Sequence, residues 1–510
     1  MEFASEFLLL FVGASSLFFY FAWVVPKQIS RPPGPPNWPI VGSLFYLSKL
    51  PHRSLEDLAK KYGPIMYLRL GFLDHIVVSN AEMAMEVLKV HDADFTSRPP
   101  IIAGKYASFD WSNIGLASYG DHFRLLRKIC ATQLFTQARL NSFGPGRQEE
   151  MAYMVENIAK HSHGGKLVEI RPIFHQLTSN IICRTLFGTR REKSNDLLGN
   201  DFDNFFQSNT KMLKIMNKLN ISDLIPILKW FDLQGIERSM KHESNQIKKF
   251  LSKILKEYRK GNKVLANSTS TDFVDILLSL DERLDDKSIM GVLTDIIATG
   301  TETSSNTLEW ALSELIHHPK IMKGAHEELD RVVGKNRAVI ESDLPNLPYL
   351  QAIVKETLRL HPAVPMSIPH YNLKDSQILN YKILAKTNVL VNTWAISRDP
   401  KAWKNPLDFN PDRFYNSNIS VGGSNYNLLP FGSGRRRCPG LDQAQIVVEC
   451  GLATILQAFD WFPQPGVKPE DMNMMEATGL TCPIAKALVA IAKPRLPPNI
   501  FKCVDHLCKL

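Results

Sequence analysis

One cysteine stands in a loop whose composition strongly restricts its surroundings. The sequence FGSGRRRCPG at 431–440 places Cys438 among three glycines and three arginines, just before an apolar helical run at 446–459. Glycine lets backbone amides approach a sulfur atom closely. Those amides, the arginines and the positive end of the following helix all favour a thiolate over a thiol. Gly434 supplies part of this freedom, and Phe431 can shield the sulfur from water. The loop is therefore predicted to hold a buried, anionic sulfur.

A buried thiolate is a good axial ligand for haem iron, and this ligation favours O–O cleavage. The loop resembles the haem loop of the cytochrome P450 family at its five fixed positions, which are Phe431, Gly434, Arg436, Cys438 and Gly440. A basic loop with a free cysteine and no role is a weak rival to so many matches. The resemblance implies haem b as the cofactor, with Cys438 as the protein ligand of its iron.

Length and composition allow a large cytosolic enzyme. The chain has 510 residues and enough apolar content for a sizeable core, either in several domains or in one large α-rich unit. Its seven cysteines are scattered and lack CxxC spacing, which argues against a disulfide framework or a zinc site and favours a reducing compartment. The net charge of +9 is dispersed. This distribution suits a membrane surface or an acidic protein partner, and we expect no nucleic-acid partner.

The N-terminal region predicts a membrane anchor followed by a stiff hinge. Residues 7–25 form an uncharged run of nineteen residues, which as a helix would span roughly 28 Å, close to the thickness of a bilayer core. Acidic residues precede the run and basic residues follow it, so the rest of the chain is expected in the cytosol. A cleaved signal peptide is disfavoured, because the amino end is acidic and no clear cleavage site follows. We expect a single transmembrane helix at 1–26, retained in the endoplasmic reticulum membrane.

The stretch at 27–42 is rich in proline and cannot be helical. It predicts a hinge that holds the catalytic domain, 43–510, at a fixed angle to the bilayer. A ligand for a proline-binding partner module is the alternative. The order of anchor, hinge and WPIVG resembles the plant microsomal members of the same family.

The remaining chain reads as one mainly α domain with small β-sheets. Polar stretches at 188–200 and 261–271 predict surface loops rather than domain linkers. Short strands are expected at 65–70, 75–79, 381–383, 389–392 and near 487–492. Helices are expected at 81–91, 120–134, 148–160, 170–187, 245–260 and 286–317.

The longest predicted helix contains the sequence ATGTETS at 298–304. Its glycine and β-branched polar residues weaken a helix centre and predict a local bulge. An N-cap cluster that starts a helix at Thr303 is the alternative. The segment resembles the oxygen-activating motif of the P450 family, but departs from it at Thr299, where alanine or glycine is usual. The resemblance implies catalytic roles for Thr303, as a proton donor or relay to dioxygen, and for Glu302, as its link to solvent. Thr299 leaves the shape of the distal pocket open.

Glu356 and Arg359 lie three residues apart in an apolar helix, so they share one face and are expected to form a buried ion pair. Such a pair needs further hydrogen bonds to offset desolvation, and Arg413 in the segment NPDRF is a plausible third member. Glu328 and Arg331 have the same spacing, and we expect that pair on a solvated face. The resemblance implies that Glu356, Arg359 and Arg413 hold the thiolate loop in place.

The two propionates of haem need cationic or hydrogen-bonding partners. Arg436 of the thiolate loop is one candidate. The helix at 120–134 resembles the Trp-x-x-x-Arg helix of the family, with Arg127 at the arginine position and Phe123 where tryptophan is usual. His370 matches a position where family members carry arginine or histidine, and a surface histidine is the alternative there.

These matches cover essentially the whole chain and imply a plant haem-thiolate monooxygenase of specialised metabolism. It would insert one atom of dioxygen into a small apolar substrate, either a terpenoid or a phenylpropanoid- or flavonoid-type aromatic. Electrons would come from NADPH through the flavins of a cytochrome P450 reductase that docks near 435–437. The expected cavity-lining segments are 100–114, 290–303, 363–369 and 478–481, with Met366, Ile368 and Leu480 facing the substrate.

Two other functions were weighed. A reductase-independent haem-thiolate isomerase or dehydratase is disfavoured by the intact Thr303 and Glu302. A non-enzymatic membrane haem protein needs neither the oxygen-activating helix nor a substrate-sized cavity.

Overall fold

The computed structural model describes residues 30–190, 199–261, 272–280 and 284–501. The predicted anchor at 1–26 and the first residues of the predicted hinge lie outside these residues. Within the described ranges, no helix is both long and apolar enough to cross a bilayer. The part of the hinge that is described binds along the first strand of a sheet, because the N–H of Tyr67 donates to the carbonyl of Pro33 (2.8 Å).

The described residues form three small sheets, and most of the strand pairs in them are antiparallel. The largest has the order β1-β2-β7-β4, and its β2–β7 pair is parallel. A second has the order β3-β9-β8, and β5 pairs with β6. The strands are β1 (Ile65–Leu70), β2 (Leu73–Val78), β3 (Leu167–Glu169), β4 (His370–Tyr371), β5 (Ser376–Ile378), β6 (Tyr381–Ile383), β7 (Asn388–Val391), β8 (Phe459–Pro463) and β9 (Val489–Pro494).

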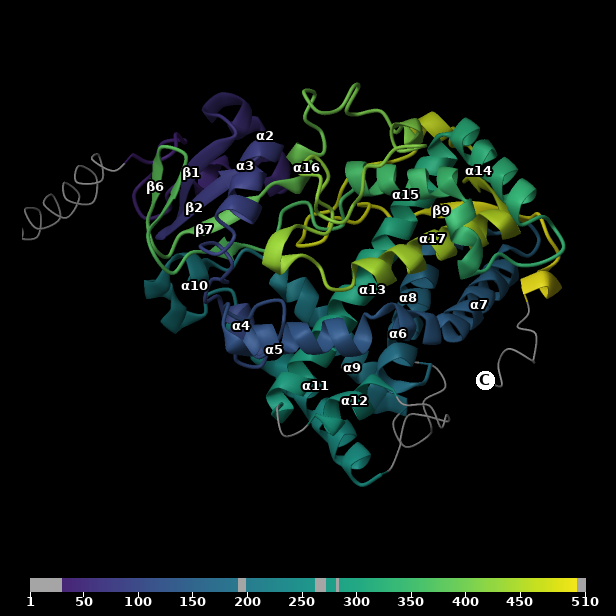
Figure 1. Cartoon of the computed structure of the whole chain (residues 1–510), viewed down its shortest axis with the longest axis horizontal. Helices are drawn as coiled ribbons and strands as arrows, with labels where there is room; N and C mark the ends of the chain where they lie inside the picture. The colour runs from purple at the N-terminus through teal and green to yellow at the C-terminus, as the bar shows by residue number, and fades with distance from the viewer. Residues whose placement is uncertain (1–29, 191–198, 262–271, 281–283, 502–510) are drawn as a thin grey trace, which may run out of the picture.

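Helices make up most of the described chain. They are α2 (Pro51–Tyr62), α3 (Ala81–Met85), α4 (Ile102–Tyr106), α5 (Asp121–Ile129), α6 (Gln137–Ser142), α7 (Gly144–Ser162), α8 (Ile170–Phe187), α9 (Gly199–Met216), α10 (Ile221–Leu224), α11 (Ile236–Arg259), α12 (Phe273–Ser279), α13 (Asp286–His317), α14 (Pro319–Val332), α15 (Pro348–Leu360), α16 (Thr393–Ile396) and α17 (Leu441–Ala458). Figure 1 shows the four-stranded sheet at one end of the molecule and α7, α14 and β9 at the other.

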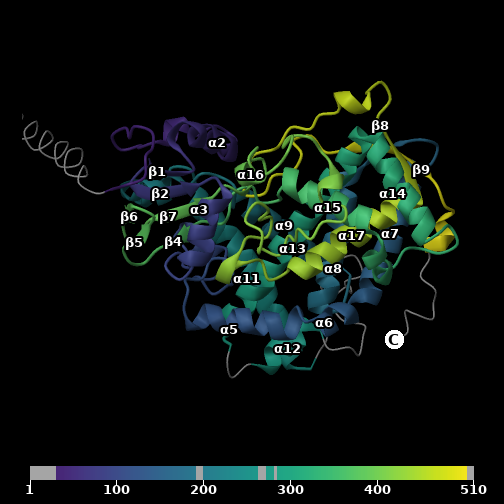
Figure 2. The same cartoon turned by 45° about the horizontal axis from the view of Figure 1, so that its top comes forward.

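Helix α13 passes through the centre of the molecule, and α8, α15 and α17 pack against it (Figures 1 and 2). Most of its residues are buried, as expected for a helix that is apolar on nearly all sides. Its first turn is capped by Asp285, which accepts a hydrogen bond from the N–H of Ser288 (2.9 Å). The predicted bounds of α8 and α13 are confirmed.

One expectation about local helix geometry is wrong. Helix α13 is a continuous α-helix, without the predicted bulge and without a helix start at Thr303. The threonine hydroxyls that were expected to weaken it bond back to carbonyls one turn earlier, so no backbone group is released. Gly300 has a packing role instead, since a Cβ there would lie 2.8 Å from Cδ1 of Ile182 on α8. In addition, the helices expected at 81–91 and 120–134 each end in a π-helical turn, at Glu86–Val90 and Cys130–Leu134.

Candidate active site

The loop that carries Cys438 forms a tight turn just before α17. A 3₁₀ turn at Gly434–Arg436 precedes the cysteine, and the N–H of Cys438 donates to the carbonyl of Phe431 (2.9 Å). Gly434 has φ +68°, and a Cβ there would lie 2.5 Å from the carbonyl oxygen of Leu88. Position 434 therefore requires glycine because the segment that carries Leu88 approaches it closely, and not because of the sulfur. The ring of Phe431 packs against the largest core cluster.

Opposing effects act on the sulfur of Cys438, which is partly buried. Burial raises the pKa of the thiol, while the N–H of Gly440 and the guanidinium groups of Arg127 and Arg437 act to lower it. The sequence-based expectation named amides and arginines as the stabilising groups, and both contribute. Arg127 comes from α5, so the structure brings a second predicted site residue beside the sulfur.

Three guanidinium groups and one imidazole gather next to this loop, and we call them the cation cluster. Its members are Arg98, Arg127, His370 and Arg436. Burial and the neighbouring arginines Arg98 and Arg436 lower the pKa of His370 to about 3, and burial together with Arg127 lowers that of Arg436 to about 10. None of the four forms an ion pair with a carboxylate of the described residues. The cluster is thus partly buried and positive, and acidic groups act on it, among them Asp92, on Arg436, and the thiol of Cys438, on Arg127.

Backbone carbonyls orient the two arginines of the cluster that lie deepest. Arg98 donates to the carbonyls of Gly115 (3.1 Å), Ile368 (2.8 Å) and Pro369 (2.9 Å). Arg436 donates to three other carbonyls, and its guanidinium lies 3.8 Å from the ring centroid of Phe123. Arg98 is a site residue that was not predicted from the sequence. The available signal was one arginine inside the otherwise uncharged run 95–102.

On α13, the predicted catalytic residues lie where the helix becomes accessible. Thr299 is exposed, and Glu302 and Thr303 are half-buried, whereas most of the helix is buried. The hydroxyl of Thr303 donates to the carbonyl of Thr299 (2.7 Å). Glu302 accepts a hydrogen bond from the hydroxyl of Thr481 (2.7 Å), so the predicted lining segment 478–481 does reach this helix.

The other residues predicted to line the cavity lie in different parts of the fold. Leu480 is held near the end of α9 by a bond from its N–H to Oδ1 of Asn217 (2.7 Å), and Ile368 packs against the helical cluster that contains α13. Met366 instead packs in the small cluster beside the four-stranded sheet.

The predicted ion-pair residues are brought together in the core. Glu356 and Arg359 are both fully buried and form a bidentate pair (2.6 and 2.8 Å), and Nε of Arg413 lies 3.2 Å from Glu356. Arg359 also donates to the carbonyls of Ser397 and Pro406. These bonds fasten α15 to the segment that leads toward the thiolate loop.

The second Glu-x-x-Arg pair, Glu328 and Arg331, was predicted on a solvated face, and this is wrong for Glu328. Glu328 is buried rather than solvated, and its carboxylate accepts the N–H groups of Tyr349 and Leu350 (both 2.9 Å) at the start of α15. It satisfies N–H groups that the helix itself leaves without partners. Arg331 is exposed, as expected.

Another cysteine, Cys482, lies in a buried polar cluster with His52 and Glu476. Each oxygen of that carboxylate is already bonded, to Trp394 (2.7 Å) on one side and to His52 (3.0 Å) and Arg53 (2.8 Å) on the other. Burial raises the pKa of the Cys482 thiol to about 12. This arrangement fits an internal clamp better than a metal centre.

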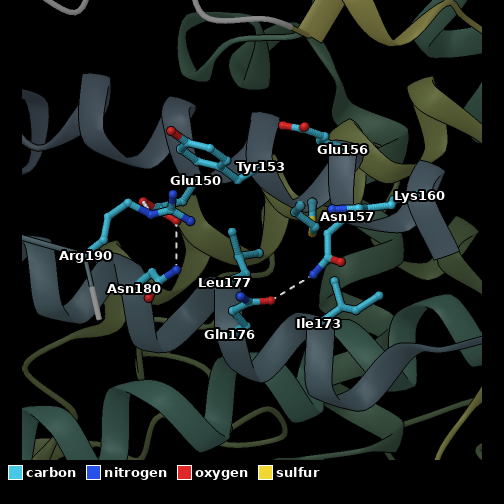
Figure 3. A pocket seen from close by; sticks show the side chains of 11 residues that line it. Glu150, Tyr153, Glu156, Asn157, Lys160, Ile173, Gln176, Leu177, Asn180 and Arg190 are labelled. Carbon is cyan, nitrogen blue, oxygen red and sulfur yellow. Dashed lines mark hydrogen bonds and ion pairs between the residues drawn. The ribbon is translucent and has the colours of Figure 1, made fainter. Parts of the chain in front are cut away.

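A surface hollow of about 290 Å³ lies between α7 and α8 (Figure 3). The guanidinium of Arg190 covers the ring of Tyr153 at 3.6 Å, and Asn157 donates to Gln176 (2.9 Å). None of the predicted site residues lines this hollow. It is separate from the site described above.

The sequence model of the cytochrome P450 family matches residues 32–491. The chain belongs to this family. This chain is thus a monooxygenase with haem as its cofactor. Members of the family hold the haem through a cysteine thiolate.

Comparisons with known proteins agree in sequence and in fold. The chain is 40% identical to a flavonoid 3'-monooxygenase of Arabidopsis thaliana over 92% of its length and 93% of the relative. It is 37% identical to an iridoid oxidase of Catharanthus roseus (91% and 92% covered) and to a dimethylnonatriene synthase of Zea mays (99% and 100% covered). A zebrafish cytochrome P450 structure with abiraterone matches with a TM-score of 0.72 at 24% identity, covering 87% of this chain and 100% of that one, and so supports the fold alone.

Proposed function

We propose that Cys438 is the residue that would hold the haem iron, through its thiolate. The observation that carries this proposal is the position of Cys438 just before α17, where the N–H of Gly440 and the guanidinium groups of Arg127 and Arg437 act on its sulfur. A coordinated metal cation deprotonates a thiol outright, which overcomes the effect of burial on this group. Bound in this way, the haem supplies dioxygen activation with O–O cleavage.

The cation cluster fits the two carboxylates of haem. Buried charges in proteins are paired. The side-chain hydrogen bonds of Arg98, Arg436 and His370 go to backbone carbonyls, and no carboxylate of the described residues forms a salt bridge with them. We assign Arg98, Arg127 and Arg436 to electrostatic attraction of the carboxylates and His370 to a hydrogen bond. Phe123 contributes no polar group and supports Arg436 from beneath.

Thr303 and Glu302 are assigned to proton delivery on the distal side. The hydroxyl of Thr303 is held by Thr299, which fixes its oxygen toward the accessible face of α13. Glu302 is oriented by Thr481 and stands one residue away, so it is placed to pass protons from solvent.

The substrate is a small apolar specialised metabolite. The relatives named above act on a flavonoid or carry terpenoid-type names, and the apolar side chains of Ile114, Ile368 and Leu480 are compatible with either class. We place the electron donor, an NADPH–cytochrome P450 reductase, at the exposed Arg435 and Arg437 beside the thiolate loop.

Membrane attachment is assigned to the predicted helix at 1–26 in the endoplasmic reticulum membrane, with the catalytic domain cytosolic. An exposed apolar patch supports a second contact with lipid. It consists of Ile227, Trp230, Phe231 and Leu233, of which Trp230 is 92% exposed.

The decisive experiment compares two cysteine variants. Cys438→Ser is expected to lose the thiolate-type absorption band of the reduced carbon-monoxide complex and reductase-driven product formation. Cys482→Ser, which alters the other cysteine near α13, is expected to keep both. The reverse pattern would move the ligand to Cys482.

A further inference from the structure

The turn 113–117 is held by a single acidic residue of α13. Asp295 accepts hydrogen bonds from Nδ2 of Asn113 (2.5 Å), from the N–H of Ile114 (2.8 Å) and from the N–H of Gly115 (2.9 Å). All three donors belong to the turn, and none comes from the helix itself. The carboxylate therefore acts between elements that are far apart in sequence.

The opposite side of the same turn faces the cation cluster. Arg436 donates to the carbonyls of Ile114 (3.2 Å) and Ala117 (2.6 Å), and Arg98 donates to that of Gly115 (3.1 Å). The peptide between Ile114 and Gly115 thus has its N–H on an anion and its C=O on a cation. Both interactions match the direction of the peptide dipole, so each strengthens the other.

Close packing leaves the turn little freedom to move. A Cβ at Gly291 of α13 would lie 2.5 Å from the carbonyl oxygen of Ser112, so helix and turn touch through backbone atoms. The amide of Asn113 is fixed on both sides, because its Oδ1 accepts the N–H of Leu116 (2.9 Å) while its Nδ2 donates to Asp295.

Asp295 is an unusual residue for this part of α13, because the helix is apolar over most of its length. Burial raises the pKa of Asp295 to about 6, and the three hydrogen bonds from the turn act in the opposite direction. No ion pair of Asp295 exists within the described ranges. Burying the carboxylate of Asp295 costs free energy of desolvation. Its presence is explained if the carboxylate is needed to hold the turn in position.

We propose that Asp295 is a positioning residue of the monooxygenase: its carboxylate fixes the turn 113–117, which in turn aims Arg98 and Arg436 and places Ile114 as a wall of the substrate cavity. This inference rests on the proposed haem site. It assigns to one carboxylate a joint influence on haem retention and on the cavity.

The hydrogen bonds permit a rescue experiment. In Asp295→Asn, one oxygen still accepts the N–H groups of Ile114 and Gly115, but the new NH₂ faces the NH₂ of Asn113, and turning either amide only moves the conflict elsewhere. In the double variant Asp295→Asn with Asn113→Asp, the amide of residue 295 donates to the new carboxylate, whose other oxygen still accepts from Leu116. Every donor then has an acceptor.

Two measurements test the proposal in the haem-loaded protein: the rate of haem transfer to apomyoglobin and the affinity for 4-phenylimidazole as a probe of the cavity. Asp295→Asn is expected to release haem about tenfold faster, equivalent to about 1.4 kcal/mol, and to bind the probe more weakly. The double variant is expected to return toward wild type in both. Asp286→Asn removes a charge from the exposed end of the same helix and is the matched control.

The outcomes separate this inference from the proposed function. If the wild type lacks a thiolate-type band, the proposed function fails. If the wild type has the band but Asp295→Asn releases haem and binds the probe as the wild type does, only the role of Asp295 fails. Should the single variant not fold, a folded double variant with normal haem release supports the proposal. A double variant that is as defective as the single one overturns it.

Discussion

Cys130, Cys450 and Cys482 are buried, and burial raises the pKa of each thiol to about 12. Cys438 also feels burial, but it has the Gly440 N–H and two guanidinium groups beside it, and it is the one described cysteine that is not fully buried. Cys438 therefore differs from Cys130, Cys450 and Cys482 in the polar groups around its sulfur, although burial has the largest effect on it and its pKa is also raised.

At Thr303, removal of one hydroxyl is expected to affect chemistry without affecting haem binding. Thr303→Ala should retain the haem spectrum while product formation falls about a hundredfold, since a positioned proton donor contributes at least that much. NADPH consumption should continue, so the product formed per NADPH is the measurement. Thr307→Ala is the control, because its hydroxyl makes the same bond to a carbonyl one turn earlier but is buried. Equal product per NADPH in Thr303→Ala and wild type would remove Thr303 from proton delivery.

Arg98 is expected to contribute to haem affinity through the haem carboxylates. Arg98→Leu should release haem about tenfold faster, the effect of losing one charged hydrogen bond. The difference between variant and wild type should disappear when both are loaded with haem dimethyl ester, which has no carboxylates. A difference that persists with the ester would assign Arg98 to holding the carbonyls of Ile368 and Pro369 alone. Arg124→Leu, which alters an exposed arginine of α5, serves as control.

The buried ion pair of Glu356 with Arg359 was predictable, because a motif fixes the spacing of the two residues. Arg98 and Glu328 were not, because their importance comes from partners distant in sequence: the carbonyls of Ile368 and Pro369 for Arg98, and the N-terminus of α15 for Glu328. Local spacing carries no information on which element will cover a side chain.

Among the elements, α15 depends on its buried ion pair. Glu356→Gln would leave the guanidinium of Arg359 buried without a counter-ion, and such a loss destabilises a protein by about 3–5 kcal/mol. We expect a decrease of this size in the free energy of unfolding, measured by urea titration. Glu327→Gln, on the exposed face of α14, should change it by less than about 0.5 kcal/mol. A small effect of Glu356→Gln would mean that the carbonyls around Arg359 suffice to hold its charge.

The ends of α13 and α15 are joined by Glu314, which accepts a hydrogen bond from His361 (2.6 Å) and lies 3.2 Å from His318. Burial raises the pKa of Glu314, but these histidines outweigh it and hold the value at about 2, below the ordinary 4.5. The resulting stabilisation is present above pH 4.5 and is lost as the pH falls toward 2. Glu314 raises the pKa of His318, so that contribution is present below pH 6.5 and is lost at higher pH.

Glu314→Gln is therefore expected to flatten the acid side of the stability curve. The wild type should lose about 3 kcal/mol through this group between about pH 5 and about pH 2, and the variant should not. Urea unfolding over that range measures the difference. Parallel curves for the two proteins would show that the histidines do not set the pKa of Glu314.

Elements with strong periodicity and clear ends were predicted well, and those with mixed signals were not. Helix α8 ends at Gly188 in the left-handed conformation, and α13 begins at a capping aspartate, so both bounds were readable. The π-helical turns after α3 and α5 continue an apolar pattern that a 3.6-residue period also fits. The missing bulge in α13 has another cause, since threonine hydroxyls can satisfy backbone carbonyls without breaking the helix.

At the scale of the whole molecule, the first described residues and the exposed apolar patch lie at the same end. Ser30 accepts a hydrogen bond from the N–H of Lys382 at β6, and the patch follows α10, whose Leu224 carbonyl is bonded to the N–H of Phe72 at the β1–β2 turn. Pro33 in turn accepts a hydrogen bond from the N–H of Tyr67 on β1, so β1 and the β1–β2 turn link the start of the described chain to the patch (Figure 1). An anchor before residue 30 and a patch at this end would contact one membrane together.

This arrangement predicts that membrane binding has two separable parts. Removal of 1–26 should weaken but not abolish sedimentation with phosphatidylcholine vesicles, because Trp230 and Phe231 remain. Adding Trp230→Ser and Phe231→Ser to the truncated chain should weaken it by at least a further tenfold, since each buried aromatic contributes about 1.5–3 kcal/mol. Phe462→Ser removes an exposed aromatic side chain from β8, at the far end of the molecule (Figure 2), and should have no effect. If the truncated protein no longer sediments with vesicles at all, lipid contact belongs to 1–26 alone and the patch has another partner.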